Sequence, residues 1–466
     1  MKKEKLFSGK KVTVMGLGLH GGGVGVAKFF YQEGAQVLVT DLKTKAQLEK
    51  SLKKLKKLKI TYRLGEHRED DFINTDLVVK NPAVPQSSHF LQVARDHNVQ
   101  VATDIDIFFE FCKAQIIGVT GTKGKSTTAT LIYEILRSKF RNTVLAGNIG
   151  VSPLEILGKI NEKTKVVLEL SSFELEDLKR SPNIAVITSL YPDHLDRYAS
   201  YEEYIDAKKI IFKYQKPNDY LVLNYDNPQT RNFERGANAN VYFFSNHFYL
   251  KREGKNPGCF VEDENVFFNN EKDPIFNVNQ VKLSGEHNLS NLMAAVTVAK
   301  ILEIPNDKIK RVVSKFQGVA NRQQFVAEKR GVRYVNDTTA TMPDAVIQAL
   351  KTLKEEYPQS RIILIAGGQD KNLEYKNLAK EIVDKAVLLI LLPGTASEKI
   401  KKELKDAGSR IQIVAVGSMQ DAVKSASATA RDNDIVLLSP AAASFNIFKN
   451  EFDRGDQFVQ AVKRIK

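Results

Sequence analysis

The segment from Ile116 to Thr128 combines residue types that can hold the phosphates of a nucleotide. An apolar run leads into Thr120-Gly-Thr-Lys-Gly-Lys-Ser126, and apolar residues at helical spacing follow, which predicts a strand, a turn and a helix. Glycines in such a turn let backbone N–H groups face an anion, a lysine places charge near the β- and γ-phosphates, and a serine hydroxyl can bind Mg²⁺. The general phosphate-loop pattern has a glycine where this chain has Val119. The surrounding pattern still predicts an ATP site at seven residues: Gly121, Thr122, Lys123, Gly124, Lys125, Ser126 and Thr127.

Acidic and imidazole groups follow two later predicted strands. Glu169 lies near the end of the apolar run 166–170, and a carboxylate at the carboxyl end of a strand beside a phosphate loop is well placed to hold Mg²⁺. His194 lies in Tyr191-Pro-Asp-His-Leu-Asp-Arg197, after another apolar run. A single loop histidine is most often simply exposed to solvent. The two neighbouring aspartates favour a functional role here.

Two asparagines begin a later predicted helix. Asn288 and Asn291 are one helical turn apart and therefore share a face. Capping of the helix by Ser284 or Asn288 is the simpler interpretation. Alternatively, an asparagine amide matches the donor and acceptor on the amino edge of adenine.

Three polar segments in the last third of the chain each follow an apolar run that predicts a strand. Asn336-Asp-Thr-Thr-Ala-Thr341, with Arg322 before it, offers hydroxyls and a carboxylate for a ribose or an oxyanion. The other two segments are Gly367-Gly-Gln-Asp-Lys371 and Leu438-Ser-Pro-Ala-Ala-Ala-Ser-Phe445. Because the carboxyl ends of parallel strands meet at one edge of a sheet, we expect the three segments to converge on one polar rim.

A glycine-rich turn follows the first predicted strand. Gly16, Gly18 and Gly21 match a dinucleotide-binding pattern, and Asp41 follows the second strand. The pattern has weak specificity, because any ligand with a phosphate or a ribose can use such a turn. A nicotinamide-dependent dehydrogenase is therefore one alternative, although it leaves the phosphate loop unexplained.

Short apolar runs alternate with helical patterns along the chain, which is typical of parallel, doubly wound sheets. A length of 466 residues also exceeds what one core supports. We expect an α/β protein of three domains: a Rossmann-like domain over 1–113, a central P-loop ATPase-type parallel-sheet domain over 114–317, and a C-terminal Rossmann-like domain over 318–466, with a hinge near residues 316–320. The predicted strands besides the run before Thr120 are 11–15, 36–41, 77–79, 99–103, 166–170, 184–189, 220–224, 333–335, 361–366, 386–392, 412–416 and 435–438. Residues 227–279 are expected to form short strands and loops, with a small inserted sheet.

The formal net charge of +14 raises the possibility of a nucleic-acid partner, such as a nucleic-acid-stimulated ATPase would have. The densest lysine patch, residues 53–59, argues against this. Leu48, Leu52, Leu55 and Leu58 have helical spacing, so the lysines are predicted to cover the solvated face of an amphipathic helix over 45–58. We expect small-molecule substrates and no nucleic acid.

The remaining composition indicates a cytoplasmic protein with no membrane partner. The two cysteines, Cys112 and Cys259, have no metal-type spacing and no disulfide framework. The basic amino terminus lacks the apolar core of a signal peptide, and no run approaches the roughly 20 apolar residues of a membrane span. A monomer is the expectation, although the sequence carries little information on this point.

Taken in order, these segments resemble the Mur ligase family over essentially the whole chain. The most specific matches are Thr120-Gly-Thr-Lys-Gly-Lys-Ser126, Glu169-Leu-Ser-Ser-Phe173, Pro192-Asp-His-Leu-Asp-Arg197, Ser284-Gly-Glu-His-Asn288 and the stretch from Leu438-Ser-Pro to Arg454-Gly455. Within the last stretch, the part from Ala443 to Gly455 is characteristic of the family member that adds D-glutamate. In this family the loop begins at Thr-Gly-Thr, so Val119 is the expected residue.

The resemblance implies a cytoplasmic amide ligase of peptidoglycan precursor synthesis that uses ATP and Mg²⁺. It would add D-glutamate to UDP-N-acetylmuramoyl-L-alanine through an acyl phosphate. The implied catalytic residues are Lys125, Glu169, His194 and Lys208, and the implied metal ligands are Ser126, Glu169, His194 and, once carbamylated, Lys208. From the residues alone, Lys208 would be predicted as a surface lysine on a helix.

The resemblance also implies the binding residues. Asn288 and Asn291 would recognise adenine, and Arg322 and Asp337 would bind the ATP phosphates and ribose. In place of a dinucleotide, the first domain would bind UDP through Leu19, His20 and Asp41, with Asn148 on the alanyl-muramoyl end. Glutamate would be held by Thr341, Lys371, Ser444 and Phe445.

This chain departs from the family pattern at a few positions. It has Asn321 where the family usually has histidine, Thr339 where it has lysine and Met342 where it has asparagine. Lys80-Asn-Pro-Ala-Val-Pro85 replaces the usual Ser-Pro-Gly of the UDP pocket. These changes leave phosphoryl transfer intact but leave the amino acid open, so a related Mur-type ligase adding a different amino acid, including L-glutamate, is the alternative.

Overall fold

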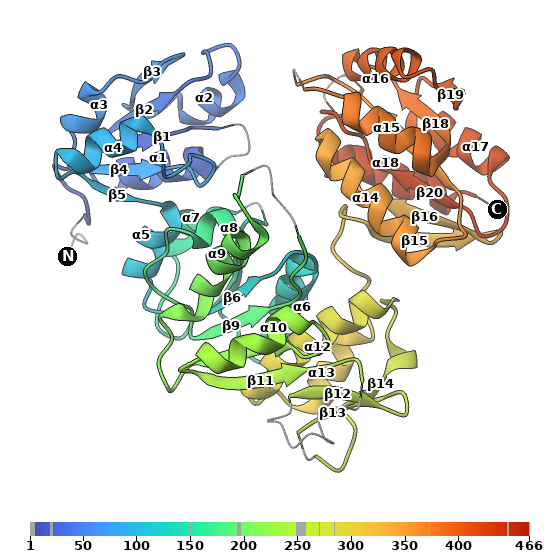
Figure 1. Cartoon of the computed structure of the whole chain (residues 1–466), viewed down its shortest axis with the longest axis horizontal. Coiled ribbons are helices and arrows are strands. Elements are labelled where there is room, and N and C mark those ends of the chain that lie inside the picture. The colour runs from blue at the N-terminus through green and yellow to red at the C-terminus, as the bar shows by residue number, and fades with distance from the viewer. Residues whose placement is uncertain are drawn as a thin grey trace. The chain divides into compact units, whose positions relative to one another are not determined.

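The computed structural model describes residues 5–18, 22–149, 151–192, 197–247, 258–269, 271–283, 285–371, 373–444 and 447–465 (Figure 1). The chain divides into two compact units, Met1–Phe316 and Gln317–Lys466. Each unit is built from parallel sheets with helices packed beside them, which confirms the predicted α/β class.

The first sheet is entirely parallel and has the order β3-β2-β1-β4-β5. Its order reverses beside β1, which places the glycine turn after β1 at the topological switch point. The elements are β1 (Lys11–Met15), α1 (Gly22–Gln32), β2 (Gln36–Asp41), α2 (Glu49–Leu55), β3 (Thr61–Leu64), α3 (Asp70–Ile73), β4 (Leu77–Lys80), α4 (His89–Asp96), β5 (Gln100–Ala102) and α5 (Asp104–Phe111). The lysines of 53–59 are exposed while Leu48 and Leu55 are fully buried, which confirms the predicted solvated face, although α2 is shorter than predicted.

The central sheet is also parallel, with the order β11-β10-β9-β6-β8-β7. The phosphate loop leaves β6, which lies between β9 and β8, and α12 packs along α6. A small antiparallel sheet of β12, β13 and β14 follows β11, as expected for an insertion. The elements are β6 (Gln115–Thr120), α6 (Lys125–Arg137), β7 (Thr143–Gly147), α7 (Pro153–Leu157), β8 (Lys165–Glu169), α8 (Ser172–Leu175), β9 (Ile184–Ile187), α9 (Tyr201–Lys213), β10 (Tyr220–Asn224), α10 (Pro228–Arg231), η1 (Asn232–Gly236), β11 (Asn240–Phe244), β12 (Cys259–Glu262), β13 (Asn265–Phe268), β14 (Phe276–Asn277), η2 (Val278–Gln280), α12 (Glu286–Ile301) and α13 (Asn306–Val313).

The second unit contains one six-stranded sheet of order β15-β16-β20-β17-β18-β19. It is parallel except for the edge strand β15, which pairs antiparallel with β16. Because β16, β20 and β17 are neighbours and parallel, the three predicted polar segments do leave the same edge of one sheet. The elements are β15 (Gln324–Lys329), β16 (Val332–Asn336), α14 (Pro343–Glu356), β17 (Ile362–Gly367), α15 (Lys376–Lys385), β18 (Ala386–Leu392), α16 (Thr395–Asp406), β19 (Gln412–Ala415), α17 (Met419–Thr429), β20 (Ile435–Leu438) and α18 (Glu451–Lys463).

Both cysteines are free thiols. Cys259 is buried in β12, and burial raises the pKa of its thiol to about 12. Cys112 is half-buried after α5, and burial also raises its pKa. Among the residues described, no helix is both long and apolar enough to cross a membrane.

The buried carboxyl group of Glu174, in α8, makes the stability of the fold depend on pH. Glu174 accepts hydrogen bonds from Ser171 N–H (2.7 Å) and Oγ (2.6 Å) in a capping box, yet burial raises its pKa to about 7. In the unfolded chain a glutamate titrates near about 4.3. Between these values the folded state keeps a proton that the unfolded chain has lost, so raising the pH through this window destabilises the fold.

We therefore expect the free energy of unfolding to fall between pH 5 and pH 7 by roughly 1.4 kcal/mol per pH unit from this group. Glu174→Gln should flatten most of that slope, because glutamine keeps an acceptor for Ser171 and does not ionise. Asp104 and Asp337, whose pKa values burial raises to about 6 and about 7, should supply further slope that Glu174→Gln leaves unchanged. Denaturant titrations at a series of pH values measure this, with the exposed Glu162→Gln as control. Equal slopes in the wild type and Glu174→Gln would contradict the expectation.

Candidate nucleotide and ligase site

The phosphate loop between β6 and α6 is bent by two glycines with positive φ. Gly121 has φ +145°, and Gly124, the N-cap of α6, has φ +85°. A Cβ at Gly121 would lie 2.0 Å from Thr188 Oγ1, so a larger residue does not fit there. The N–H of Thr122 donates to Ser189 O at 2.6 Å and fixes the loop to the segment after β9. The backbone N–H groups at the N-terminus of α6 can therefore bind an anion at this loop.

Lys125 and Ser126 are the first residues of α6. Lys125 Nζ donates to Gly121 O (3.0 Å) and Thr122 O (2.9 Å), so its ammonium lies across the loop. A phosphate bound at the loop would meet this ammonium directly. Ser126 is buried at the same helix start. The seven residues predicted for ATP therefore form one continuous loop and helix terminus.

Asn291 lies directly against the phosphate loop, which the sequence does not indicate. Its side-chain oxygen accepts from Thr128 Oγ1 at 3.3 Å and stands 2.0 Å from where a Cβ on Gly124 would be. Asn288, one turn earlier on α12, is half-buried. Both asparagines are thus on a helix that packs along α6, and Asn291 helps to shape the loop.

This contact leads to a prediction for Gly124→Ala. The added methyl group would collide with Asn291, and the left-handed backbone would cost about 1–3 kcal/mol. We expect a lower melting temperature and at least about a tenfold weaker affinity for ATP, a loss of roughly 1.4 kcal/mol. Calorimetric titration with ATP measures the affinity. Gly158→Ala is the matched control, since no atom lies within 4 Å of its Cβ position and its φ is −70°. Equal ATP affinity for Gly124→Ala and Gly158→Ala would contradict the expectation.

Glu169 ends β8 beside the last residue of β7. The register pairs Gly147 with Glu169, so Asn148 follows directly and donates through Nδ2 to Glu169 Oε1 at 3.4 Å. Glu169 is fully buried, and its Oε2 has no hydrogen-bond partner among the residues that the structure describes. A buried carboxylate oxygen without a partner is costly, and a cation would offset that cost. The structure therefore fits a cation at Glu169.

Lys208 is not a surface lysine, so the interpretation from the residues alone is wrong. It lies on α9 with only 1% of its surface exposed. Its Nζ lies 3.4 Å from Thr120 Oγ1, at the end of β6, and 4.9 Å from the centre of the Tyr204 ring. The apolar residues on the inner face of α9 carry Lys208 into the interior, beside the start of the phosphate loop.

His194 lies outside the described residues, as do Leu19, His20 and Phe445. Within the ranges that are described, no group of three or more histidine, cysteine or acidic side chains is arranged to hold a metal. A single buried carboxylate, that of Glu169, still suits Mg²⁺. This ion usually keeps several waters and binds through one or two carboxylates together with substrate phosphates.

Asp41 supports the glycine turn after β1. Its Oδ2 accepts from Gly18 N–H at 3.1 Å and its Oδ1 from Lys43 N–H at 2.9 Å. Gly23 and Gly25, at the start of α1, have a packing role. A Cβ on Gly23 would lie 2.5 Å from Leu17 O. A Cβ on Gly25 would lie 2.8 Å from Ser152 Cβ in the central sheet's region. The glycines thus let α1 approach its own turn and the segment before α7.

In the second unit, three of the predicted residues lie on loops that are joined to one another. Lys371 Nζ donates to Thr341 Oγ1 at 2.8 Å. The Lys371 loop is tied to the Ser444 loop by paired backbone bonds between Gln369 and Ala443 of 2.9 and 3.0 Å. Ser444 is buried, and its hydroxyl has no hydrogen-bond partner in the described part of the chain. The arrangement offers an ammonium and two hydroxyls to one small ligand.

Asp337 and Arg322 lie near the same edge of that sheet. Asp337 accepts from Ser439 Oγ at 2.8 Å and from Gln323 N–H at 3.1 Å, while Arg322 is exposed. Burial raises the pKa of Asp337 to about 7, and its hydrogen bonds and Arg322 oppose that shift. This carboxyl group can therefore donate or accept a hydrogen bond near neutral pH.

Comparison with known proteins places the whole chain in one family. Three family models match successive stretches: the Mur ligase MurD-like N-terminal domain over residues 10–103, the Mur ligase middle domain over 119–299 and the Mur ligase glutamate ligase domain over 321–442. A UDP-N-acetylmuramoylalanine--D-glutamate ligase of Roseiflexus sp. (strain RS-1) is 43% identical, over 98% of this chain and 99% of the relative. The chain belongs to the Mur ligase family. The relative of the same name from Acetivibrio thermocellus is 37% identical over 99% of this chain and 98% of its own length.

Solved structures place this Mur ligase in the same fold. The UDP-N-acetylmuramate-alanine ligase MurC of Thermotoga maritima matches with a TM-score of 0.54 and 21% identity, over 98% of this chain and 100% of the other. A murein peptide ligase from Psychrobacter arcticus matches with a TM-score of 0.52 and 16% identity, over 98% and 100% of the two chains. At these identities the likeness concerns the fold alone.

Thr339 and Met342, two positions at which this chain departs from the Mur ligase pattern, lie in the second unit. Thr339 donates from Oγ1 to Asn321 O at 2.9 Å, so it holds a neighbouring loop. The other departure, Met342, is exposed at the start of α14.

Arg454 belongs to the last motif that matches the family pattern, Arg454-Gly455, but the sequence predicts no separate role for it. It is fully buried, and burial lowers the pKa of its guanidinium to about 10. The guanidinium donates to Thr338 Oγ1 (3.0 Å), Thr338 O (2.8 Å) and Ala442 O (3.1 Å). It therefore joins the loops after β16 and β20 behind the Thr341, Lys371 and Ser444 side chains.

Proposed function

We propose that this Mur ligase joins D-glutamate to UDP-N-acetylmuramoyl-L-alanine at the expense of ATP, in the cytoplasmic synthesis of peptidoglycan precursors. The observation that carries the proposal is the full-length similarity to ligases of that name, which includes a MurD-like first domain. We place the domains at 1–113 for the UDP substrate, 114–317 for ATP and 318–466 for the amino acid. The protein would act as a monomer, without nucleic acid or membrane.

The phosphate loop would hold ATP, and Lys125 would neutralise charge that develops on the transferring phosphoryl group. Ser126, Glu169, His194 and a carbamylated Lys208 would hold Mg²⁺. When bound, this ion polarises phosphoryl oxygens and offsets their charge. The unpartnered oxygen of Glu169 and the burial of Lys208 beside Thr120 support these assignments.

The reaction would form a C–N bond in two steps. An oxygen of the alanyl carboxylate attacks the γ-phosphorus and ADP leaves, which gives an acyl phosphate. The amine of glutamate then attacks the carbonyl carbon, inorganic phosphate leaves with the C–O bond electrons, and the amine loses its proton. Asn148 beside Glu169 would orient the alanyl end of the substrate near the phosphate loop.

The remaining residues would bind the three substrates. Asp41, with Leu19 and His20, would bind the uridine end. Asn288, Asn291, Arg322 and Asp337 would bind the adenine, phosphates and ribose of ATP. Lys371, paired with Thr341, would meet a carboxylate of glutamate with Ser444 and Phe445, because an ammonium facing a carboxylate is a strong charge-assisted contact.

A phosphate-release assay tests the proposal. Purified protein is supplied with ATP, MgCl₂ and UDP-N-acetylmuramoyl-L-alanine, and then with D-glutamate or L-glutamate, and the product is identified by mass spectrometry. Phosphate release with D-glutamate and a product heavier by one glutamyl residue are expected, and EDTA should stop the reaction. Release with L-glutamate or another amino acid alone would favour the alternative specificity that Thr339 and Met342 leave open. No release with any amino acid would overturn the function.

A further inference from the structure

We propose that Lys80 and Arg197 are positioning residues that hold the UDP side of the substrate site against the segment 173–177, which follows Glu169. The proposal rests on the function above. It concerns a group of side chains in the first unit that we call the Lys80–Arg197 network, formed by Lys80, Glu176, Asp177 and Arg197. The network joins three segments: the loop after β4, the segment after α8 and the segment before α9.

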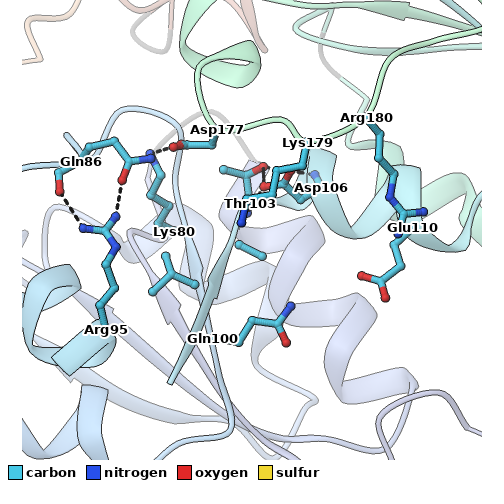
Figure 2. Close-up of a pocket in the computed structure, with 12 residues that line it drawn as sticks. Lys80, Gln86, Arg95, Gln100, Thr103, Asp106, Glu110, Asp177, Lys179 and Arg180 are labelled. Carbon is cyan, nitrogen blue, oxygen red and sulfur yellow. Dashed lines mark hydrogen bonds and ion pairs between the residues drawn. The ribbon is translucent and has the colours of Figure 1, made fainter. Parts of the chain in front are cut away.

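Lys80 is the last residue of β4 and an unusual residue to bury. Only 1% of its side chain is exposed. Its Nζ donates to Val84 O at 3.0 Å, which closes the loop 80–84 on itself, and lies 2.5 Å from Asp177 Oδ2. The side chain of Asp177 is 8% exposed. Figure 2 shows this ion pair at the wall of a cavity of about 470 Å³ lined also by Arg95, Asp106, Lys179 and Arg180.

Arg197 also donates hydrogen bonds to the loop 80–84. Its Nη2 donates to Pro82 O at 3.1 Å and to Glu176 Oε1 at 2.5 Å, and its Nη1 donates to Ala83 O at 3.3 Å. The guanidinium lies 4.1 Å above the ring of Phe173. Its neighbour Tyr198 donates from its hydroxyl to Glu176 Oε2 at 3.2 Å. Two cations and two carboxylates thus fasten the loop 80–84 to the segment 173–177.

Each end of the network reaches a part of the site. At one end, Asn81 lies against the glycine turn, since a Cβ on Gly16 would be 2.9 Å from Asn81 Cβ. That turn is the one that Asp41 supports through Gly18. At the other end, Phe173 belongs to the segment that begins at Glu169, and Arg197 is three residues from His194 in the chain. A displacement of the loop 80–84 would therefore shift both the glycine turn after β1 and the segment 173–177.

The charges make the connection strong. Each carboxylate faces a cation at low exposure, where an ion pair is screened little by solvent. Removal of Lys80 would leave the buried Asp177 carboxylate without this ion pair. Backbone carbonyls of the loop take up the remaining donors of Arg197.

The inference predicts a selective kinetic effect. Lys80→Met and Arg197→Met should each raise KM for UDP-N-acetylmuramoyl-L-alanine about tenfold, equivalent to roughly 1.4 kcal/mol, and leave KM for ATP within about twofold. Binding of UDP alone, measured by calorimetry, should weaken several-fold in both. The exchanged pair Lys80→Asp with Asp177→Lys should recover part of the loss shown by Lys80→Asp. Lys179→Met lines the same cavity outside the network and is the matched control.

Several outcomes decide the matter. Wild-type protein that binds UDP and releases phosphate, with Lys80→Met and Arg197→Met unchanged in UDP affinity and KM, would overturn this inference alone. Wild-type protein that neither binds UDP nor turns over would overturn the proposed function as well. A lower melting temperature with unchanged UDP affinity would mean a purely structural role and would also overturn it. Should Lys80→Met fail to fold, Lys80→Arg and the more exposed Arg197→Lys provide the same comparison.

Discussion

Replacing Lys125 with alanine is expected to lower the rate of phosphate release by at least about a thousandfold. The transferring phosphoryl group carries negative charge over its equatorial oxygens, and a fixed positive group at a helix N-terminus stabilises it more than water does. Lys125 is the cation that lies across the loop, within hydrogen-bond distance of Gly121 O and Thr122 O. Single-turnover measurement of ADP formation isolates this step from product release.

The fold of this variant should remain intact, because the backbone bond from Thr122 N–H to Ser189 O that fixes the loop does not involve the Lys125 side chain. Its melting temperature should therefore fall by a few degrees at most. The exposed Lys159→Ala is the control for removal of a positive charge. Wild-type turnover by Lys125→Ala, with ATP saturating, would show that the loop does not transfer phosphate in the way proposed.

Replacing Glu169 with glutamine is the second change with a large expected effect. Glutamine has the same shape and can still accept from Asn148, but it has lost the charge on the oxygen that has no protein partner. We expect kcat to fall about a hundredfold to a thousandfold, and the Mg²⁺ concentration for half-maximal rate to rise at least about tenfold. Rate measurements over a series of MgCl₂ concentrations test both numbers.

Glu162→Gln, at an exposed position, is the control for that experiment. If Glu169→Gln kept the wild-type dependence on Mg²⁺, the carboxylate would have only a structural role beside Asn148. A second readout is the binding of Mn²⁺ in place of Mg²⁺, followed by its paramagnetic effect on water protons, which does not require turnover.

Much of the fold could be predicted because its central strands are buried on both faces. Strands such as β17 and β20 are apolar throughout and were predicted to within one or two residues at their ends. The strands that were missed are at the edges. β3 and β7 each lie at the end of a sheet, where half-buried residues interrupt the apolar run. The antiparallel strand β15 was missed for the same reason.

The site was predictable where it depends on local sequence and not where it depends on long-range contacts. The phosphate loop and Glu169 follow strands directly, so their positions could be inferred from the order of the elements. Lys208 and Arg454 could not be placed in this way. Lys208 meets Thr120 across 88 residues and Arg454 meets Thr338 across 116, and only the packed sheets bring these pairs together. Local sequence makes both look like ordinary residues of surface helices.

The low reactivity of the two native thiols allows the motion that the proposed reaction requires to be measured with dyes on introduced cysteines. An amine held on the second unit must reach an acyl phosphate formed on the first, so the distance between units should change during turnover. Thiolates are the reactive form of cysteine, and the raised pKa values of Cys112 and Cys259 make both native thiols slow to react at neutral pH. Cysteines introduced at exposed Lys159 and Lys402 could therefore be dye-labelled selectively without removing any native residue. Energy transfer between the two dyes would then follow opening and closing in single molecules.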